Sequence, residues 1–266
     1  MPEPVAAGRD RPPVSIVTGA SQGIGRVIAL SLAQRGDAVV LAARNASNLD
    51  QVAAEITGAG GTAVVVATDV TDLTSVEAMA AATLDRFGRI DVVVANSGIA
   101  GPSGLLWEVD PQQWQDTLSV NVVGVFHTLR ATVPAMIAGG GGSAVVIGSI
   151  SGKRPLYGRT PYTTSKLALV GLVRTLALEA GAHGVRVNLV SPGFVAGPRI
   201  DWVVSAQATA RGLAEDEVRS EFERQSPLGR LTMPEDVADA VCYLSSPAAA
   251  AVTGEDLNVN AGVVMY

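Results

Sequence analysis

Residues 14–25 read VSIVTGASQGIG, and this stretch decides the fold. Its first half is a continuous apolar run rich in β-branched residues, as in a strand that is covered on both faces. Its second half places Gly19, Gly23 and Gly25 at the turn from this strand into a helix. Glycines there let the backbone approach a pyrophosphate, and the helix N-terminus offers free N–H groups. The stretch therefore predicts a dinucleotide-binding unit, with plain turn chemistry as the alternative interpretation.

The rest of the chain continues the alternation of strand and helix. Apolar runs predict further strands at 38–42, 62–68, 91–95, 143–148, 185–190 and 256–259. Ala- and Leu-rich stretches of helical period predict helices at 24–35, 47–58, 72–87, 111–137, 160–182 and 234–245. This alternation predicts an α/β Rossmann fold, a doubly wound seven-stranded parallel sheet with helices on both faces.

The composition of the 266 residues excludes several classes of protein. Hydrophobic residues make up 48% of the chain, which is too many for a disordered protein. One cysteine and two histidines leave no disulfide framework and no set of ligands for a zinc site, so no metal is predicted. The net charge of −6 argues against nucleic acid and anionic membranes as partners. No uninterrupted apolar stretch reaches about 18 residues, so no membrane span is predicted.

A single domain is predicted for residues 14–266. Residues 1–13 read as a flexible leader that lacks the apolar segment of a secretory signal, which predicts a cytoplasmic protein. Residues 194–226 break the strand–helix rhythm with Pro198 and mixed charges. Ligands of open α/β sheets bind outside the carboxyl ends of the strands. We therefore predict that 194–226 forms a substrate lid, and an ordinary surface helix pair is the alternative.

From Val14 to Tyr266 the chain resembles the short-chain dehydrogenase/reductase family, in its single-domain branch. The sequence TGASQGIG at 18–25 is similar to the cofactor loop of that family, and Asp69-Val70 to its adenine-contacting pair. Asn96 and Gly98 match an element after the fourth strand, although Ala95 and Ser97 depart from it. The resemblance implies that the cofactor is bound by Gly19, Ser21, Gln22, Gly23, Ile24, Gly25, Asp69, Val70, Asn96, Gly98, Tyr162, Lys166, Pro192, Gly193 and Val195.

The end of the second strand distinguishes NAD from NADP. A carboxylate there would pair with the ribose 2′-hydroxyl, whereas an arginine accommodates a 2′-phosphate. Here Ala43 stands where NAD-preferring relatives have Asp, and Arg44 follows directly. A guanidinium can hold a phosphate by paired hydrogen bonds. We predict a preference for NADP(H), with NAD(H) possible, and the alternative is that Arg44 is a solvated loop residue.

Tyr162 and Lys166 are four residues apart on a predicted helix, so their side chains share one face. A free phenol has a pKa near ~10, and a nearby ammonium group lowers it toward the working range of an acid–base catalyst. Ser149 ends a predicted strand, where the ligand is expected. The Ser-x12-Tyr-x3-Lys spacing matches the catalytic pattern of the family, with Asn121 as its fourth member. The resemblance implies that Tyr162 moves the proton, Ser149 holds the carbonyl oxygen, Lys166 holds the ribose and Asn121 supports a water relay.

The resemblance is greatest to 3-oxoacyl-[acyl-carrier-protein] reductases, but two departures count against that substrate. Such enzymes dock an acidic carrier through basic residues before the fifth and sixth strands. Residues 136–142 contain no Lys or Arg, and His183 replaces an expected Arg. We therefore predict a small-molecule ketone or secondary alcohol as substrate, and do not expect an acyl carrier protein as partner. The candidate substrate-binding residues are Ser149, Ile150, Ser151, Tyr157, Tyr162, Phe194 and Trp202.

Two alternatives to this prediction stay open, a carrier-bound (or CoA-bound) 3-oxoacyl reductase and a non-catalytic dinucleotide sensor. An intact Ser149, Tyr162 and Lys166 set argues against the sensor, which has no need of a tuned phenol. Relatives are commonly homotetramers that pair through the helices at 111–137 and 160–182. The resemblance and the apolar C-terminus at 262–266 predict a homotetramer, or a homodimer.

Overall fold

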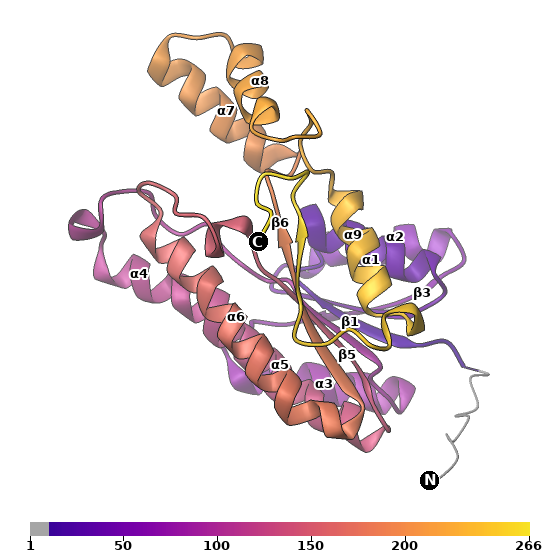
Figure 1. The fold of residues 1–266 in the computed structure, drawn as a ribbon. Helices are drawn as coiled ribbons and strands as arrows, with labels where there is room; N and C mark the ends of the chain where they lie inside the picture. Colours follow the sequence, from indigo (N-terminus) through magenta and orange to yellow (C-terminus); the bar gives the residue numbers. More distant parts are fainter. Residues whose placement is uncertain (1–10) are drawn as a thin grey trace.

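A computed structural model describes residues 11–266 (Figure 1), so residues 1–10 of the predicted leader lie outside the described part. Seven parallel strands form one sheet in the order β3-β2-β1-β4-β5-β6-β7, which confirms the predicted fold. Every predicted strand is present, with ends shifted by at most two residues. The strands are β1 Val14–Thr18, β2 Ala38–Ala43, β3 Thr62–Ala67, β4 Val92–Ala95, β5 Gly142–Ile147, β6 Val185–Pro192 and β7 Asp256–Val259.

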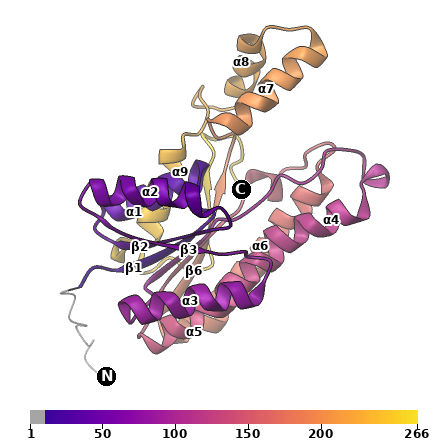
Figure 2. The same cartoon turned by 180° about the vertical axis from the view of Figure 1, so that it is seen from behind.

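Helices cover both faces of the sheet (Figure 2). One apolar core cluster joins the sheet to α1, α2 and α9, and a second joins it to α3, α5 and α6. Small aliphatic side chains dominate both clusters, which fits a chain with only 4% aromatic residues. The helices are α1 Gly23–Gln34, α2 Ala46–Gly58, α3 Leu73–Phe87, α4 Pro111–Leu118, α5 Gly124–Ala138, α6 Thr160–Ala180, α7 Pro198–Arg211, α8 Glu215–Arg224 and α9 Pro234–Leu244.

The long helix predicted at 111–137 is interrupted by a turn of π-helix. The segment Ser119–Val123 winds as a π-helix between α4 and α5, and it carries Asn121. Such π-turns often occur at functional sites. The whole run Pro111–Ala138 is long and apolar enough to cross a membrane by length and composition alone. Its buried residues, including Leu129 and Met136, pack in the core against the sheet, and this accounts for its apolar character.

The segment 194–226 forms α7 and α8, which project beyond the carboxyl ends of the strands (Figure 1). The two helices share a small apolar cluster that is separate from the two main core clusters, and it is built around Ile200, Val204 and Val218. The segment is a pair of helices, as the alternative interpretation predicted. It also lies at the edge of the sheet where ligands bind, as a substrate lid would. Its role as a lid stays a prediction.

Candidate active site

The strand order reverses between β1 and β4, and the glycine loop lies at this point. The Gly19 N–H donates to the Ala42 carbonyl at 2.7 Å, and Gly19 has a φ of +67°, which favours glycine. A Cβ atom at Gly25 would lie 2.2 Å from the Gly19 carbonyl oxygen and 2.4 Å from Asn96 Nδ2. The N-terminus of α1 is therefore packed so closely against the loop that only glycine fits at position 25.

The first turn of α1 offers free donors to an anion. The Gln22 side chain makes no capping hydrogen bond, and no acidic residue lies in that turn. A Cβ atom at Gly23 would meet nothing within 4 Å, so the loop is open there. Uncapped N–H groups and the helix dipole favour a phosphate. The residues present thus fit the pyrophosphate of a dinucleotide.

Thr18 ties the ends of β1 and β4 together. Its Oγ1 accepts hydrogen bonds from the backbone N–H groups of Asn96 (3.0 Å) and Ser97 (3.2 Å). The Asn96 side chain donates back to the Thr18 carbonyl at 2.9 Å. We did not single out Thr18 from the sequence, although it begins the quoted TGASQGIG motif. Asn96, predicted as a cofactor contact, has its amide committed to shaping the loop.

The predicted adenine side lies at the ends of β2 and β3. The Asp69 carboxylate accepts from the Thr71 N–H (2.9 Å) and hydroxyl (2.7 Å). These bonds, helped by the charge of Arg44, hold the pKa of Asp69 below its ordinary value. Val70 is buried, and its carbonyl contacts His127 Nδ1 of α5 at 3.0 Å. Arg44 is exposed between β2 and the N-terminus of α2, where the neighbouring Asn45 caps the helix.

Tyr162 and Lys166 lie on α6, and Ser149 lies two residues after the end of β5, where it caps the short 3-10 turn Ile150–Gly152. The ammonium group of Lys166 is buried and donates to the Ile147 carbonyl at 2.8 Å. It lies 5.8 Å from the centroid of the Tyr162 ring. The structure therefore brings together the serine, tyrosine and lysine that the sequence spacing singled out.

The pKa of the Tyr162 phenol is lowered from its ordinary value of 10.0. Burial alone would raise this pKa, but the charges of Lys166 and Arg199, the hydrogen bond with Ser149 and the charge of Arg159 outweigh burial. Burial lowers the pKa of Lys166, Tyr162 opposes that shift, and Arg199 adds to it. The surrounding positive charges thus favour the phenolate form of Tyr162 relative to a free phenol.

Asn121 is buried in the π-turn, and its amide links two parts of the site. Its Oδ1 accepts from the Ile99 N–H at 2.8 Å, and its Nδ2 donates to the Ile99 carbonyl and to Ser165 Oγ, both at 3.0 Å. Ser165 in turn donates to the Tyr162 carbonyl at 2.7 Å. Asn121 therefore positions the loop after β4 against α6, and its implied water relay stays a prediction.

Two glycines on the predicted nicotinamide side are packed closely against neighbouring residues. A Cβ atom at Gly98 would lie 3.3 Å from Asn121 Oδ1 and 3.6 Å from Lys166 Nζ. A Cβ atom at Gly193 would lie 2.8 Å from the Cα of Asn260. Pro192 and Val195, which flank the second glycine in the chain, lie at the end of β6 and just after it. The structure thus places the predicted contacts along the carboxyl edges of β4 and β6.

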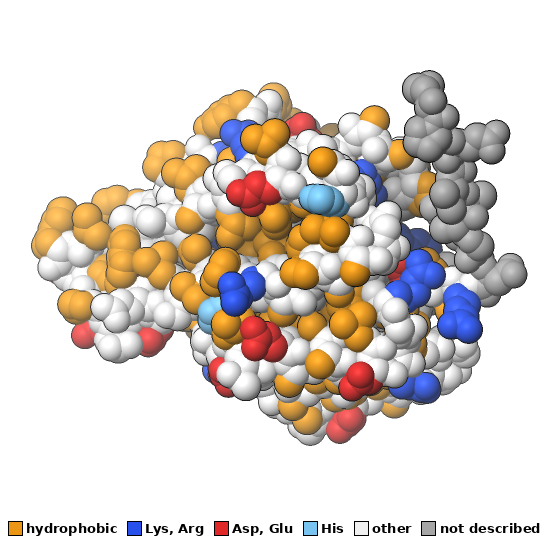
Figure 3. All heavy atoms as spheres, turned by 90° about the horizontal axis from the view of Figure 1, so that it is seen from below, with side chains coloured by type: hydrophobic (Ala, Val, Ile, Leu, Met, Phe, Trp, Pro, Cys, Tyr) orange, Lys and Arg blue, Asp and Glu red, His pale blue; other side chains and the backbone are white. Residues whose placement is uncertain are grey.

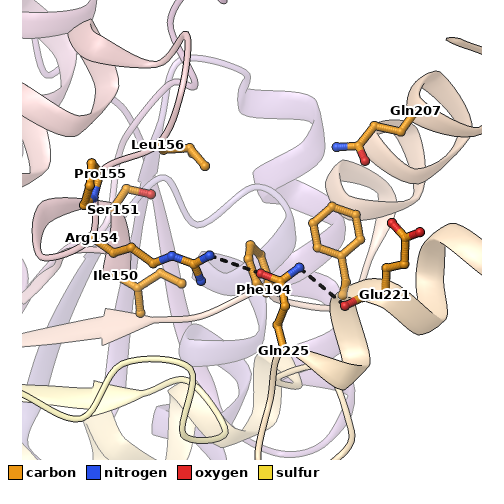
Figure 4. A pocket seen from close by; sticks show the side chains of 10 residues that line it. Ile150, Ser151, Arg154, Pro155, Leu156, Phe194, Gln207, Glu221 and Gln225 are labelled. Atoms are coloured by element: carbon orange, nitrogen blue, oxygen red, sulfur yellow. Dashed lines mark hydrogen bonds between the residues drawn. The ribbon is translucent and has the colours of Figure 1, made fainter. Parts of the chain in front are cut away.

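A cavity of about 210 Å³ adjoins this site, between the loop after Ser149 and α7 and α8 (Figure 4). Three predicted substrate residues, Ile150, Ser151 and Phe194, line it. Phe194 packs edge-on against Phe222 of α8, with ring centroids 5.0 Å apart. The other lining residues, which the sequence did not single out, are Arg154, Pro155, Leu156, Gln207, Glu221, Phe222 and Gln225. Those from α7, α8 and the residue after α8 reach the cavity only through the tertiary fold.

Four predicted substrate residues do not line this cavity, namely Ser149, Tyr162, Tyr157 and Trp202. The Tyr157 side chain is 88% exposed and that of Trp202 is 70% exposed. Helix α7 buries Ile200 and Val204 in its own cluster, and Trp202, midway between them in the chain, therefore falls on the opposite face. Tyr157 lies in an exposed turn before α6. Their role as substrate contacts stays a prediction.

The fold and the glycine loop are those of a dinucleotide-binding protein, and comparison with known proteins assigns the family. A family model described as enoyl-(acyl carrier protein) reductase matches residues 19–264. The chain is 38% identical to cis-4-hydroxycyclohexanecarboxylate dehydrogenase from Sinomonas cyclohexanicum, over 94% of this chain and 95% of that protein. It is 35% identical to 3-oxoacyl-[acyl-carrier-protein] reductase from Escherichia coli, over 95% and 97% of the two chains.

Among solved structures, a single-residue variant of actinorhodin polyketide ketoreductase with NADPH superimposes with a TM-score of 0.91. It shares 35% sequence identity, and the match covers 96% of this chain and 98% of the other. The chain therefore belongs to the short-chain dehydrogenase/reductase family. It is an oxidoreductase of the class that acts on CH–OH or ketone groups and binds NAD(P).

Proposed function

We propose that the protein is an NADP(H)-dependent oxidoreductase that interconverts a small-molecule ketone and a secondary alcohol. The observation that carries the proposal is the convergence of Ser149, Tyr162 and Lys166 at the ligand edge of the sheet, with Lys166 Nζ 5.8 Å from the centroid of the Tyr162 ring. A panel of ketones and alcohols, assayed with both nicotinamide cofactors, tests it. Turnover of several ketones with NADPH is the expected result, and binding of NADPH without any turnover would contradict the proposal.

In ketone reduction, Tyr162 donates its phenolic proton to the carbonyl oxygen, and Ser149 donates a hydrogen bond to the same oxygen. The positive charge of Lys166 stabilises the phenolate that remains. A nicotinamide bound at this edge of the sheet would provide hydride transfer at the carbonyl carbon in either direction. In alcohol oxidation, Tyr162 accepts the hydroxyl proton instead. Asn121 and Ser165 keep α6, and with it Tyr162, in register with the loop after β4.

The residues that would hold the dinucleotide form one line along the sheet edge. Gly19, Ser21, Gln22, Gly23, Ile24 and Gly25 would surround the pyrophosphate at the N-terminus of α1. Asp69 and Val70 would contact the adenine. The nicotinamide side would be formed by Asn96, Gly98, Tyr162, Lys166, Pro192, Gly193 and Val195.

The Arg44→Asp substitution is expected to reverse the cofactor preference. Arg44 is exposed, and it makes no ion pair with another residue that the structure describes, so its guanidinium is free to meet a 2′-phosphate beside the N-terminus of α2. A carboxylate there would repel that phosphate and accept from the 2′-hydroxyl of NAD. The ratio of kcat/KM for NADPH to that for NADH should fall by about 100-fold or more, since two charge-assisted bonds are lost. An unchanged ratio would show that Arg44 is only a solvated loop residue.

The pH dependence of the two directions should be opposite. Ketone reduction needs the protonated Tyr162, so its kcat/KM should fall as the pH rises through the pKa of the phenol. Alcohol oxidation needs the phenolate and should rise through the same value. Because that pKa is lowered, the midpoint of the fall in ketone reduction and the midpoint of the rise in alcohol oxidation should both lie below pH 10.0. Rate profiles from pH 5 to 11 in both directions measure it, and limbs at or above 10.0 would contradict the assignment.

A carrier-bound 3-oxoacyl substrate is the second candidate, and one observation favours it. The two places where basic residues were expected are the segment 136–142 and position 183. They lie close together at the amino-terminal edge of the sheet, where the Gly142 N–H donates to the Gly184 carbonyl at 3.2 Å. The site lies at the opposite edge, where Arg154 and Arg199 are exposed. The positions without basic residues are therefore at the other edge of the sheet from the candidate site, so their lack of charge does not prevent a carrier from docking at the site of the same chain. Competition between an acyl-carrier thioester and a free ketone separates the two candidates.

We also propose a cytoplasmic homotetramer, or homodimer. Hydrophobic side chains occupy much of the face shown in Figure 3 between scattered charges. Helices α5 and α6 and the π-turn before them carry exposed apolar side chains, among them Val123, Phe126, Leu167 and Leu178. The C-terminal Met265 and Tyr266 are each 77% exposed. Pairing through these helices and this tail would cover them, and sedimentation of the full chain measures the mass of the assembly.

A further inference from the structure

Two arginines from different parts of the fold converge on the Tyr162 ring. The Cζ atom of Arg159, which directly precedes α6, lies 5.5 Å from the ring centroid. The Cζ atom of Arg199, in the first turn of α7, lies 5.2 Å from the same centroid. Together with Lys166 they surround the phenol with three positive charges. The family's catalytic pattern, as matched in this sequence, accounts for the lysine and for neither arginine.

Arg159 is held by neutral groups that do not balance its charge. Its guanidinium donates to the Ser103 hydroxyl and to the Ala100 carbonyl, both at 2.7 Å. Its Nε is buried and has no hydrogen-bond partner in the described structure. Buried donors without a partner are uncommon in folded proteins, and an additional acceptor can satisfy such a donor. Arg159 therefore has capacity for an acceptor that the chain itself does not supply.

Arg199 has no partner among the residues that the structure describes, either by hydrogen bond or by ion pair. Of the acidic side chains of α7 and α8, Asp201 is paired with Arg219 and Glu221 with Arg211. The charge of Arg199 also adds to burial in lowering the pKa of Arg159, so the two guanidinium groups repel each other. An anion between them would relieve this repulsion.

We propose that Arg159 and Arg199 form an anion subsite that holds a carboxylate on the substrate. The inference rests on the proposed function and narrows its substrate to oxo acids and the corresponding hydroxy acids. A guanidinium binds a carboxylate by paired, charge-assisted hydrogen bonds. Both Cζ atoms lie within 5.5 Å of the ring whose hydroxyl meets the carbonyl, so only a short spacer separates the carboxylate from the reacting carbon.

A phosphate of the cofactor is the other source of such an anion. The pyrophosphate is expected at the first turn of α1, and the 2′-phosphate at Arg44, which are different parts of the sheet edge. Kinetics of the arginine variants distinguish a substrate carboxylate from a cofactor phosphate, because each affects a different kinetic constant. Loss of a substrate carboxylate contact alters kcat/KM for the acid, whereas loss of a cofactor contact raises KM for NADPH.

The test compares 4-oxocyclohexanecarboxylate with its uncharged methyl ester in the wild-type protein, in Arg199→Gln and in Arg159→Gln. Arg199→Gln is the main variant, because no bond to another described residue is lost with it. The wild type should prefer the acid by about tenfold or more in kcat/KM, and each variant should lose most of that preference. Comparing the acid with the ester within each variant cancels any change in the pKa of Tyr162. Arg211→Gln removes a charge from the same helix and should keep the preference.

Direct binding gives a readout that does not need turnover. With NADPH present, cyclohexanecarboxylate should bind more tightly than cyclohexanecarboxamide in calorimetry, and Arg199→Gln should abolish the difference. Equal kcat/KM for acid and ester would overturn the subsite and leave the proposed function standing. The subsite would also be overturned if Arg199→Gln changed only KM for NADPH. The same holds if turnover of a carrier-bound thioester depended on Arg199 while turnover of the free acid did not. Carboxylate binding without turnover of any ketone would support the subsite and overturn the proposed function.

Discussion

The Tyr162→Phe substitution is expected to lower kcat for ketone reduction by about 10² to 10⁴-fold, the usual contribution of a positioned general acid. The change removes only the phenolic hydroxyl, so the ring keeps its place beside Arg159, Arg199 and Lys166. The substitution removes at most one of the proposed nicotinamide-side contacts and leaves the glycine loop and the N-terminus of α1 untouched, so the variant should still bind NADPH. Single-turnover absorbance of NADPH measures the rate, and fluorescence titration measures the binding.

The matched control is Tyr243→Phe, which removes a hydroxyl group from the half-exposed tyrosine of α9. Tyr243 belongs to neither the cavity nor the cluster around Tyr162, so its kcat should equal that of the wild type. Equal turnover of Tyr162→Phe and the wild type would remove Tyr162 as the proton donor and, with it, the proposed mechanism.

The Gly25→Ala substitution is expected to damage both stability and cofactor binding. The added methyl group would lie 2.2 Å from the Gly19 carbonyl oxygen, and neither it nor the backbone can move without opening the loop against α1. Overpacking of this kind costs about 1–3 kcal/mol of unfolding free energy. The N–H groups of α1 would shift with the loop, so the Kd for NADPH should rise about tenfold or more, which corresponds to about 1.4 kcal/mol.

Urea unfolding and fluorescence titration with NADPH measure these two effects. Gly58→Ala is the control, because a Cβ atom in that last turn of α2 meets nothing within 4 Å and Gly58 is exposed. Alanine there should leave Kd unchanged and stabilise the helix slightly. If Gly25→Ala bound NADPH as tightly as the control, the glycine loop would not be the pyrophosphate site.

The fold could be predicted because most strands of the buried parallel sheet are continuous apolar runs in the sequence. The strand at 38–42 is covered on both faces in the structure, and its residues are nearly all buried, as a continuous apolar run predicts. The register of Ser149, Tyr162 and Lys166 could be predicted because it depends on one strand end and on one helix face. Local periodicity is sufficient for such placements.

Features that depend on tertiary contacts could not be predicted. The π-turn that carries Asn121 leaves no mark in the apolar period, and helical propensity does not distinguish it from the helix around it. Arg199 is 37 residues from Tyr162 in the chain, and it reaches the ring only because α7 returns over the carboxyl edge. The same folding of α7 turns Trp202 to solvent and brings α8 to the cavity. These side chains come from separate helices and loops, and no regular spacing in the sequence predicts which of them lie close together.

The most direct test of the central claim is the transfer of label from cofactor to substrate. NADPH carrying deuterium at C4 of the nicotinamide is incubated with the protein and 4-oxocyclohexanecarboxylate or another ketone that it turns over, and the alcohol is examined by mass spectrometry and NMR. The account predicts one deuterium on the carbinol carbon, from one face of the nicotinamide only, and almost none in Tyr162→Phe over the same time. Tight binding of NADPH with no label in any alcohol would contradict the account and identify the protein as a dinucleotide sensor.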